Sequence, residues 1–400
     1  MATSPYSQQV GSLLEQLGPL FSFMTRSPWA QRQGDPTICD FVVGNPHDMP
    51  LPGFVDALQR WSVPRTKDWF AYTLGEQPAR AAIAASLRER RQLPFDEEDV
   101  FITNGGFAAI AVALRAIIDP GDEVIFLSPP WFFYELLIQA SGAVPVRVKV
   151  NLATFDLDLE AIAAAITPRT RAIIVNSPHN PTGVIYPPET LEHLARLLTA
   201  ASARNSRALF ILSDEAYSRI VFDGRPYFSP AAFYPNTFVL YTYGKTLLAP
   251  GQRLGYIALP PSMPGREQLR PAILLAQFMT GFAVANALLQ HALPELETLS
   301  IDVGHLERKR DRLLEALREL GYDVHTPAGT FYLLPRSPWA DDRAFVELLG
   351  RHDVFVLPGA LVELPGYFRI SLTANDDMID RAIPGFAAAL EQARTTRGVG

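Results

Sequence analysis

One lysine and one arginine, Lys245 and Arg253, lie eight residues apart in the segment YTYGKTLLAPGQRLGY. Apolar runs at residues 238–240 and 256–259 enter and leave this segment, which predicts a strand, a loop and a second strand, with Lys245 at a strand end. A buried lysine of lowered pKa can form a Schiff base with an aldehyde, and an arginine nearby suits a phosphate. Pyridoxal phosphate (PLP) carries both groups. Taken alone, the pair is also compatible with two solvated surface charges.

A glycine pair precedes a predicted helix. Gly105 and Gly106 lie between the apolar residues 100–103 and a helical pattern over 107–118. Glycines at such a turn let a ligand approach the backbone, and the free N–H groups of a helix N-terminus attract phosphate. The backbone around Gly106 and Phe107 is therefore a candidate phosphate site, although a plain tight turn has the same pattern.

Asn180 lies in the segment NSPHNPTG, which follows a predicted strand ending at Val175. Two proline-containing turns so close together hold a polar side chain rigidly at a sheet edge. Asn180 is thus a candidate donor to a phenolate oxygen, and its alternative is a bond to its own loop backbone. His179 is assigned to the structure of the loop rather than to chemistry.

Asp214 lies at the end of another strand, predicted over residues 209–212. A carboxylate buried there needs a cationic partner, and a protonated pyridine nitrogen is one. That pairing would keep the ring an electron sink, and Tyr217 could reach a ring hydroxyl. The alternative partner is a structural arginine or lysine. Glu215 is predicted to face away.

Arg369 lies inside the apolar run YFRISL near the C-terminus. A guanidinium in such a strand needs a carboxylate, and the α-carboxylate of a substrate would be a bidentate match. An internal aspartate or glutamate is the alternative partner.

The composition and net charge exclude several classes of protein. The 400 residues are 48% hydrophobic and 19% charged, as in an ordinary globular chain of roughly two domains. A net charge of −7 without a dense basic cluster argues against nucleic-acid binding. Cys39 is the one cysteine, which excludes an internal disulfide and a cysteine-based zinc site. We expect no metal.

The N-terminus and one apolar stretch bear on location. Residues 1–10 have neither the basic start nor the apolar core of a secretory signal. Residues 271–290 carry no charge but include polar side chains that a lone membrane-spanning helix would bury at a cost. We therefore expect a cytoplasmic protein without a membrane span, and a helix at 271–290 that is buried at a domain or subunit contact.

Short apolar runs alternate with helical patterns from about residue 100 to 212. This alternation predicts an α/β fold with a mainly parallel sheet that helices cover on both faces. In such sheets ligands bind beyond the carboxyl ends of the strands, where the candidates above lie.

The last third of the chain has a different pattern. A charge-rich amphipathic helix over 293–320 ends at Gly321, and shorter strands and helices follow, typical of a smaller α+β domain. The first 40 residues or so are predicted to form an irregular arm. The predicted division is an arm at 1–43 that belongs to the small domain, a large cofactor-binding domain at 44–290, and a small C-terminal domain at 291–400.

Four of these motifs, in this order and spacing, resemble those of the class I/II aminotransferases, the PLP enzymes of fold type I that include aspartate aminotransferase. The motifs are Asn180-Pro181-x-Gly183, Asp214-x-x-Tyr217, Lys245-x7-Arg253 and Phe368-Arg369-Ile370-Ser371. The resemblance extends from about Gly44 to the end of the chain. It implies a large PLP-binding domain and a smaller α+β domain.

The resemblance implies a role for each matching residue. Lys245 would hold PLP as a Schiff base and then carry the proton between the substrate Cα and the cofactor. Asp214 would pair with the pyridine nitrogen, while Asn180 and Tyr217 would hold the ring oxygen. Arg253, Thr242 and the backbone of Gly105, Gly106 and Phe107 would bind the cofactor phosphate, and Trp131 would stack on the ring. Tyr72 would reach a phosphate in the neighbouring subunit. Gly44 and Arg369 would bind the substrate carboxylate.

The chain departs from the family pattern at three points. Phe107 stands where many relatives place a serine or threonine that donates to the phosphate. Gly244 precedes the lysine where serine or alanine is commoner, and the loop around Tyr72 is slightly short. A core aromatic is the alternative for Trp131, and the match at Gly329-Thr330-Phe331-Tyr332 is taken as structural only.

The expected function is transamination between an L-amino acid and a 2-oxo acid, in a homodimer whose Tyr72 reaches the partner's site. Elimination or cyclisation of an amino acid shares the same first steps and stays open. A non-catalytic PLP-binding regulator is a remote alternative, because the N-terminal arm is too short and insufficiently basic for a DNA-binding module. No second arginine is clearly placed to read a side-chain carboxylate, so the substrate is not predicted.

Overall fold

The computed structural model describes residues 5–397, and these divide into two compact units. Unit 1 contains Met1–Asp48, Leu306–Thr326 and Phe331–Gly400, and unit 2 contains Met49–His305 and Pro327–Thr330. The boundary predicted after residue 290 falls within helix α11 (Ala287–Leu296). The predicted division at 1–43, 44–290 and 291–400 stays a prediction.

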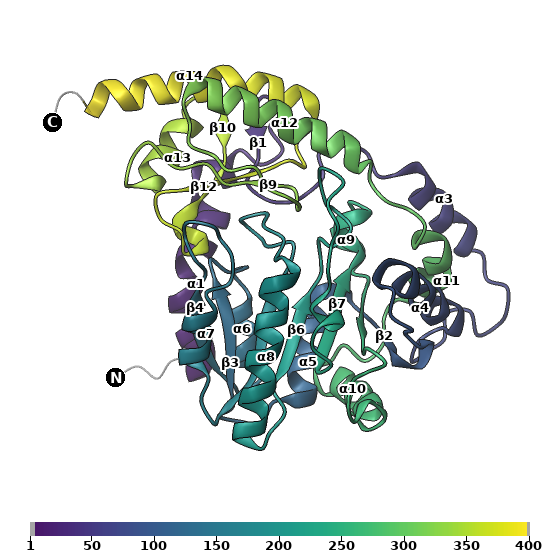
Figure 1. Ribbon diagram of the computed structural model, residues 1–400. Helices are drawn as coiled ribbons and strands as arrows, with labels where there is room; N and C mark the ends of the chain where they lie inside the picture. Colours follow the sequence, from purple (N-terminus) through teal and green to yellow (C-terminus); the bar gives the residue numbers. More distant parts are fainter. Residues whose placement is uncertain (1–4, 398–400) are drawn as a thin grey trace. The chain divides into compact units, whose positions relative to one another are not determined.

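Unit 2 is built on a seven-stranded sheet in the order β2-β8-β7-β6-β5-β3-β4 (Figure 1). All neighbouring pairs are parallel except those of β8, which runs antiparallel to both β7 and β2. The mainly parallel sheet is therefore confirmed. The strands are β2 (Val100–Thr103), β3 (Glu123–Ser128), β4 (Val144–Lys149), β5 (Thr170–Asn176), β6 (Phe210–Asp214), β7 (Thr237–Thr242) and β8 (Gly255–Ala258).

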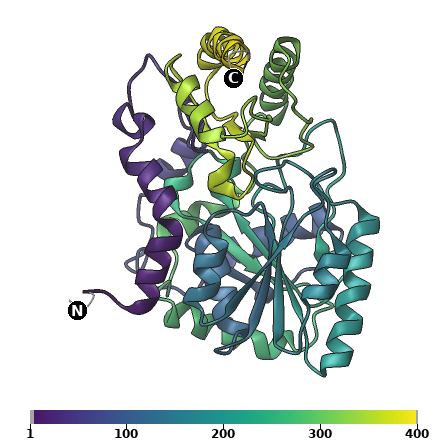
Figure 2. The ribbon, with the colours of Figure 1, turned by 90° about the vertical axis from the view of Figure 1, so that its left-hand side faces the viewer.

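Alternating strand residues divide the core of unit 2 into two apolar clusters. Phe101 and Ile257 belong to one cluster, whereas their chain neighbours Ile102 and Tyr256 belong to the other. This is the two-residue period of a strand buried on both faces. Figure 2 shows helices on both sides of the large sheet. The first cluster includes residues of the helices α5 (Gly105–Ile117), α6 (Tyr134–Ala140) and α10 (Arg266–Met279). The second cluster includes residues of α3 (Pro52–Trp61), α4 (Gln77–Arg91) and α11.

Strands β7 and β8 form the predicted strand–loop–strand around the lysine. A one-turn helix, α9 (Tyr243–Thr246), follows β7 directly, and Thr242 pairs with Gly255 where the two strands meet. Lys245 thus lies one turn beyond the carboxyl end of β7.

Unit 1 carries a three-stranded sheet, β11-β12-β9, and a parallel pair, β1-β10. Phe368 and Arg369 of β12 pair with Pro358 and Leu357 of β11. The elements are α1 (Gln8–Arg26), α2 (Pro28–Gln31), β1 (Cys39–Asp40), α12 (Val303–Leu320), β9 (Tyr332–Leu333), α13 (Asp342–Gly350), β10 (Val354–Phe355), β11 (Leu357–Pro358), β12 (Phe368–Ser371) and α14 (Asp376–Arg397).

The expectation of an irregular N-terminal arm is wrong, because α1 is a helix of 19 residues. Ser7 caps it by accepting a hydrogen bond from the Val10 N–H, and its buried side chains Leu17 and Leu20 are three residues apart. The cap and this spacing outweigh Pro19, which costs the helix one internal hydrogen bond.

The long helix predicted over 293–320 is also wrong in extent. It is two helices, α11 and α12, with Asp302 accepting from the His305 N–H at the start of the second. The uncharged stretch 271–290 is likewise interrupted, since α10 ends at Met279 and Gly281 adopts a φ of +79°. Within residues 5–397, no helix has both the length and the apolar character needed to cross a membrane.

Candidate active site

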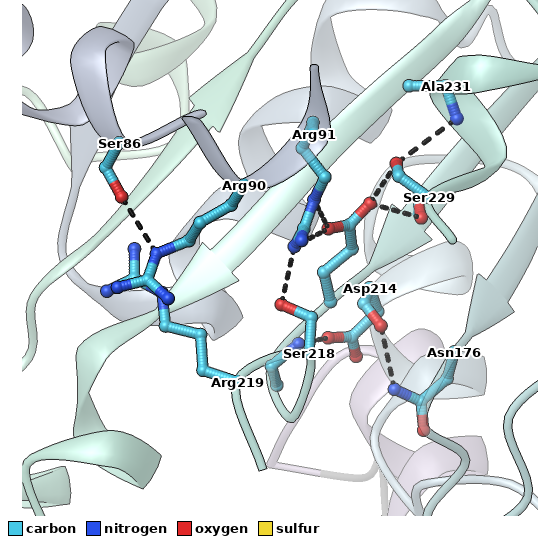
Figure 3. Close-up of polar contacts among 12 residues, drawn as sticks. Ser86, Arg90, Arg91, Asn176, Asp214, Ser218, Arg219, Ser229 and Ala231 are labelled. Atoms are coloured by element: carbon cyan, nitrogen blue, oxygen red, sulfur yellow. Dashed lines mark hydrogen bonds and ion pairs between the residues drawn. The ribbon is translucent and has the colours of Figure 1, made fainter. Parts of the chain in front are cut away.

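Two parallel strand ends bring the Asn180 loop and Asp214 together in unit 2. Asn176 of β5 pairs in register with Asp214 of β6, and its amide Nδ2 donates to the Asp214 carbonyl at 2.9 Å (Figure 3). The other side of the same amide, Oδ1, accepts from the backbone N–H of Asn180 at 2.8 Å. One asparagine therefore ties the loop to the neighbouring strand end, and Asn180 itself is buried.

The Asp214 carboxylate is partly buried and hydrogen-bonded on both oxygens. The Tyr134 hydroxyl donates to Oδ2 at 2.5 Å, and the Ala216 N–H donates to Oδ1 at 3.2 Å. Burial raises the pKa of Asp214, while these two hydrogen bonds and the positive charge of Lys245 pull it back down. Of the alternative partners, a structural arginine or lysine, no arginine forms an ion pair with Asp214 within residues 5–397, and the cation that acts on Asp214 is Lys245.

Glu215, the next residue, has a separate set of partners. Its Oε2 pairs with Arg91 Nη2 at 2.6 Å, and its Oε1 accepts from the hydroxyls of Ser213 and Ser229. Figure 3 shows Arg91 reaching this carboxylate beside Asp214, with a further bond to Ser218. The charge of Glu215 is thus used within the fold, which leaves Asp214 for the site.

Lys245 lies beside both members of the Asp214-x-x-Tyr217 motif. Its Nζ is 5.5 Å from the centre of the Tyr217 ring, and its charge lowers the pKa of Asp214. The amine of Lys245, which follows β7, therefore shares one small region with the carboxylate and the phenol that follow β6.

Gly105, Gly106, Thr242 and Arg253 meet at the start of α5, and we call this group the phosphate cup. A Cβ on Gly105 would lie 2.9 Å from Arg253 Nη2, and one on Gly106 would lie 3.3 Å from the Thr242 Cβ. Gly105 also has a φ of +81°, which a larger residue adopts only at a cost. Bare backbone at a helix N-terminus, beside a guanidinium and a hydroxyl, is suited to a phosphate.

The structure explains why glycine precedes Lys245. A Cβ on Gly244 would lie 2.8 Å from the Cα of Pro250, which is closer than real Cβ atoms come. Pro250 in turn accepts a hydrogen bond from Arg253 Nη1 at 2.8 Å. The departure at Gly244 therefore lets the lysine turn pack against the arginine loop.

Trp131 and Phe107 belong to one aromatic group next to Asp214. The Trp131 ring meets the Phe107 ring edge-on at 5.5 Å and the Tyr134 ring at 5.3 Å. Because the Tyr134 hydroxyl bonds Asp214, Trp131 lies close to the carboxylate that would hold a pyridine ring. Phe107 thus contributes an aromatic edge where a hydroxyl was expected.

His179 is structural, as assigned. Its Nδ1 is 2.8 Å from the Thr182 hydroxyl, and burial lowers its pKa to about 4, which keeps the imidazole neutral near pH 7. Tyr72 lies apart from these residues in the chain's own fold. It is 95% exposed and lines a pocket together with Leu74 and Phe278.

Gly44 and Arg369 belong to unit 1, where one tyrosine contacts both. The Arg369 guanidinium lies 4.1 Å from the centre of the Tyr332 ring, and its Nη2 donates to the Val42 carbonyl at 3.0 Å. A Cβ on Gly44 would lie 2.7 Å from the Tyr332 hydroxyl oxygen. A buried guanidinium beside bare backbone is suited to a carboxylate.

Two contacts of the candidate site were missed in the sequence. Tyr134 follows Trp131 by three residues in an aromatic run, but its bond to Asp214 spans 80 residues. Tyr332, taken as structural only, stacks on Arg369. Among residues 5–397, no cluster of histidine, cysteine, aspartate and glutamate is arranged to hold a metal.

The residues of unit 2 fit PLP. In the phosphate cup a Cβ at Gly105 would meet the Arg253 guanidinium, so the bare backbone there is what lets a phosphate approach, and the partly buried Asp214 carboxylate is the partner that a protonated pyridine nitrogen requires. Lys245 would supply the amine for the aldehyde, and its charge acts on that carboxylate.

Comparison with known proteins gives a consistent family. The model of aminotransferase class I and II matches residues 36–386. An aspartate/prephenate aminotransferase of Thermus thermophilus is 33% identical over 374 residues, 91% of this chain and 93% of the relative. An arginine–pyruvate transaminase of Pseudomonas aeruginosa is 32% identical, over 85% of this chain and 86% of the relative. A solved amino transferase structure from Eubacterium rectale matches with a TM-score of 0.89 at 29% identity, covering 98% of this chain and 99% of that one.

Replacing Tyr134 by phenylalanine removes a hydrogen bond that lowers the pKa of Asp214. Charge-assisted bonds of this kind contribute about 1.5–3 kcal/mol, so we expect PLP to bind at least about tenfold more weakly. The pKa of Asp214 rises further, so cofactor binding is lost at a higher pH as the solution is acidified. Titrations of PLP absorbance at several pH values measure both effects. Tyr186→Phe is the control, since that buried hydroxyl has no hydrogen-bond partner among the described residues; an unshifted acid limb in Tyr134→Phe contradicts the assignment.

Adding a methyl group at position 244 tests the packing of the lysine turn. Gly244→Ala pushes against the Pro250 backbone, and overpacking of this kind costs about 1–3 kcal/mol of stability. We expect a lower midpoint of thermal unfolding and weaker PLP binding. Gly251→Ala, in the same loop, is the matched control because its Cβ would meet nothing within 4 Å. Equal behaviour of the two variants would show that the contact is not limiting.

Proposed function

Because the chain belongs to the class I and II aminotransferases, a family of PLP-dependent transferases, we propose that it moves an amino group between an L-amino acid and a 2-oxo acid, with Lys245 as the covalent attachment point for PLP. The observation that supports this most is the meeting of Lys245, Tyr217 and the partly buried Asp214 at the carboxyl ends of β6 and β7. The cofactor supplies an aldehyde that takes up the amino group and a ring that accepts electrons from the substrate Cα.

The side chains of unit 2 would hold the cofactor and move the proton. Asp214 would keep the pyridine nitrogen protonated, and Asn180 and Tyr217 would bind the ring oxygen. The Lys245 amine would remove the proton from the substrate Cα and deliver it to the cofactor carbon on the other side of the transferred nitrogen. The ring would stack on Trp131, and the phosphate would be bound by Arg253, Thr242 and the backbone of Gly105, Gly106 and Phe107.

The substrate carboxylate is proposed to bind in unit 1. Arg369 would take it by two parallel hydrogen bonds, with the backbone of Gly44 alongside and the Tyr332 ring holding the guanidinium plane. The relatives include an aspartate/prephenate aminotransferase and an arginine–pyruvate transaminase, so family membership leaves the side chain of the substrate open.

We also propose a homodimer. In unit 2, large apolar side chains are exposed close to Tyr72 in the sequence and around its pocket: Phe70, Tyr72, Leu74, Leu275, Phe278 and Met279. Exposed apolar patches of this kind mark protein contacts. A second copy would cover them, and Tyr72 would then reach the partner's phosphate.

Reduction by borohydride tests the attachment point. PLP-loaded protein treated with borohydride and digested should give a single phosphopyridoxyl peptide that contains Lys245. An amino acid added without a 2-oxo acid should convert the bound cofactor stoichiometrically to pyridoxamine phosphate, followed by its absorbance. Ammonia release with unchanged cofactor would instead favour elimination, and a label on another lysine would remove the assignment.

Loss of the Asp214 carboxylate should abolish the electron-accepting state of the ring. In Asp214→Ala we expect PLP to be held poorly and turnover to fall by at least about a hundredfold, since roughly 3 kcal/mol or more of transition-state stabilisation is lost. Steady-state kinetics at saturating PLP measure this. Asp56→Ala, an exposed aspartate of α3, is the control. Near-normal rates in Asp214→Ala contradict the role.

A further inference from the structure

A second pocket lies in unit 1, between the end of α1, α2, α13 and the chain around β10 and β11. Its volume is about 330 Å³. Most of its wall is apolar, and its residues are Pro19, Ser22, Phe23, Arg26, Ser27, Pro28, Trp29, Arg343, Val346, Glu347, Gly350, Phe355, Val356, Pro358 and Leu361. Neither Arg369 nor Gly44 lines it. This size is at the lower end for pockets that bind small molecules, and it suits a compound with one ring.

Three charged side chains at this pocket are unpaired. Arg26, Arg343 and Glu347 are exposed and form no ion pair with another residue of the described chain. Arg343 and Glu347 lie four residues apart on α13 without closing a salt bridge. Two guanidiniums against one carboxylate leave the pocket with an excess of positive charge, which favours an anion.

A buried donor at the same pocket lacks a partner. Trp29 is 1% exposed, and its indole Nε1 has no hydrogen-bond acceptor within the described residues. Phe23 stacks on the Trp29 ring at 6.0 Å, so the indole is held in place. A buried N–H without an acceptor destabilises the fold, and such groups are rare in folded proteins unless a ligand or water satisfies them.

We propose that this pocket binds a small organic monocarboxylate with an apolar body. The carboxylate would pair with Arg26 and Arg343 and accept from the Trp29 indole, and the apolar body would pack on Phe355, Val356 and Pro358. The site is separate from the proposed PLP chemistry and does not depend on it. Pro358 belongs to β11, which pairs with the strand of Arg369, so an occupant contacts the neighbour of the substrate-binding strand.

Calorimetric titration of the PLP-loaded protein with 3-phenylpropanoate tests the proposal. This probe has no amino or oxo group and cannot turn over. Binding should persist in Arg369→Gln, which removes the proposed substrate carboxylate site. In Arg26→Gln/Arg343→Gln the Kd should rise at least about tenfold, and 3-phenylpropanamide, which lacks the charge, should bind the wild type similarly weakly. Arg351→Gln removes the same charge at the other end of α13 and should leave the Kd unchanged.

The indole resonance of Trp29 provides a second measurement on the unmodified protein. Its signal in ¹H–¹⁵N spectra can be assigned because it is lost in Trp29→Phe. This signal should shift when 3-phenylpropanoate is added to the wild type. No shift, no binding to Arg369→Gln, or an unchanged Kd in the double arginine variant would each overturn the proposal. Because these readouts are binding alone, failure of the proposed transamination would leave them untouched.

Discussion

A partly buried carboxylate beside an amine is the interaction on which the site in unit 2 depends. An ionised Asp214 in an apolar interior is costly unless hydrogen bonds and a cation compensate for lost water. The fold supplies Tyr134, the Ala216 N–H and Lys245 from three different segments. Each must be in place at once, so the strand ends, the aromatic run and the lysine turn are mutually constrained. The proposed chemistry requires the same arrangement.

The adjacent acids Asp214 and Glu215 have different partners because of the geometry of the strand that carries them. Successive side chains of a strand point to opposite faces, so neighbouring residues meet different partners. Glu215 receives Arg91 and serine hydroxyls, and Asp214 receives a tyrosine, a backbone N–H and the lysine. Pairing Glu215 with a cation also limits the repulsion that a bare second carboxylate would exert on Asp214.

The sequence was sufficient where local pattern and function coincide. The parallel sheet was predictable because its strands are apolar on both faces, and the positions of Asn180, Asp214 and Lys245 at strand ends were predictable because each follows such a strand. Tyr134 was not, because its contact with Asp214 joins positions 80 residues apart. The N-terminal helix was missed because Pro19 and the aromatic residues argued against a helix more strongly than the cap residue Ser7 argued for one. The burial of Leu17 and Leu20, which stabilises the helix, depends on the rest of unit 1 and is not visible in the local sequence.

The β7–β8 hairpin carries both Lys245 and Arg253 on one continuous piece of backbone, and the Thr242–Gly255 pair closes it. At Gly255 the surrounding backbone is too close for any side chain. The spacing between Lys245, the proposed covalent attachment point, and Arg253, the proposed phosphate ligand, is therefore an intrinsic property of this hairpin. In protein engineering, residues 242–255 should therefore be exchanged together. Moving Lys245 into another protein without the segment that carries Arg253 would lose the spacing of the two residues, whereas moving the whole hairpin preserves it.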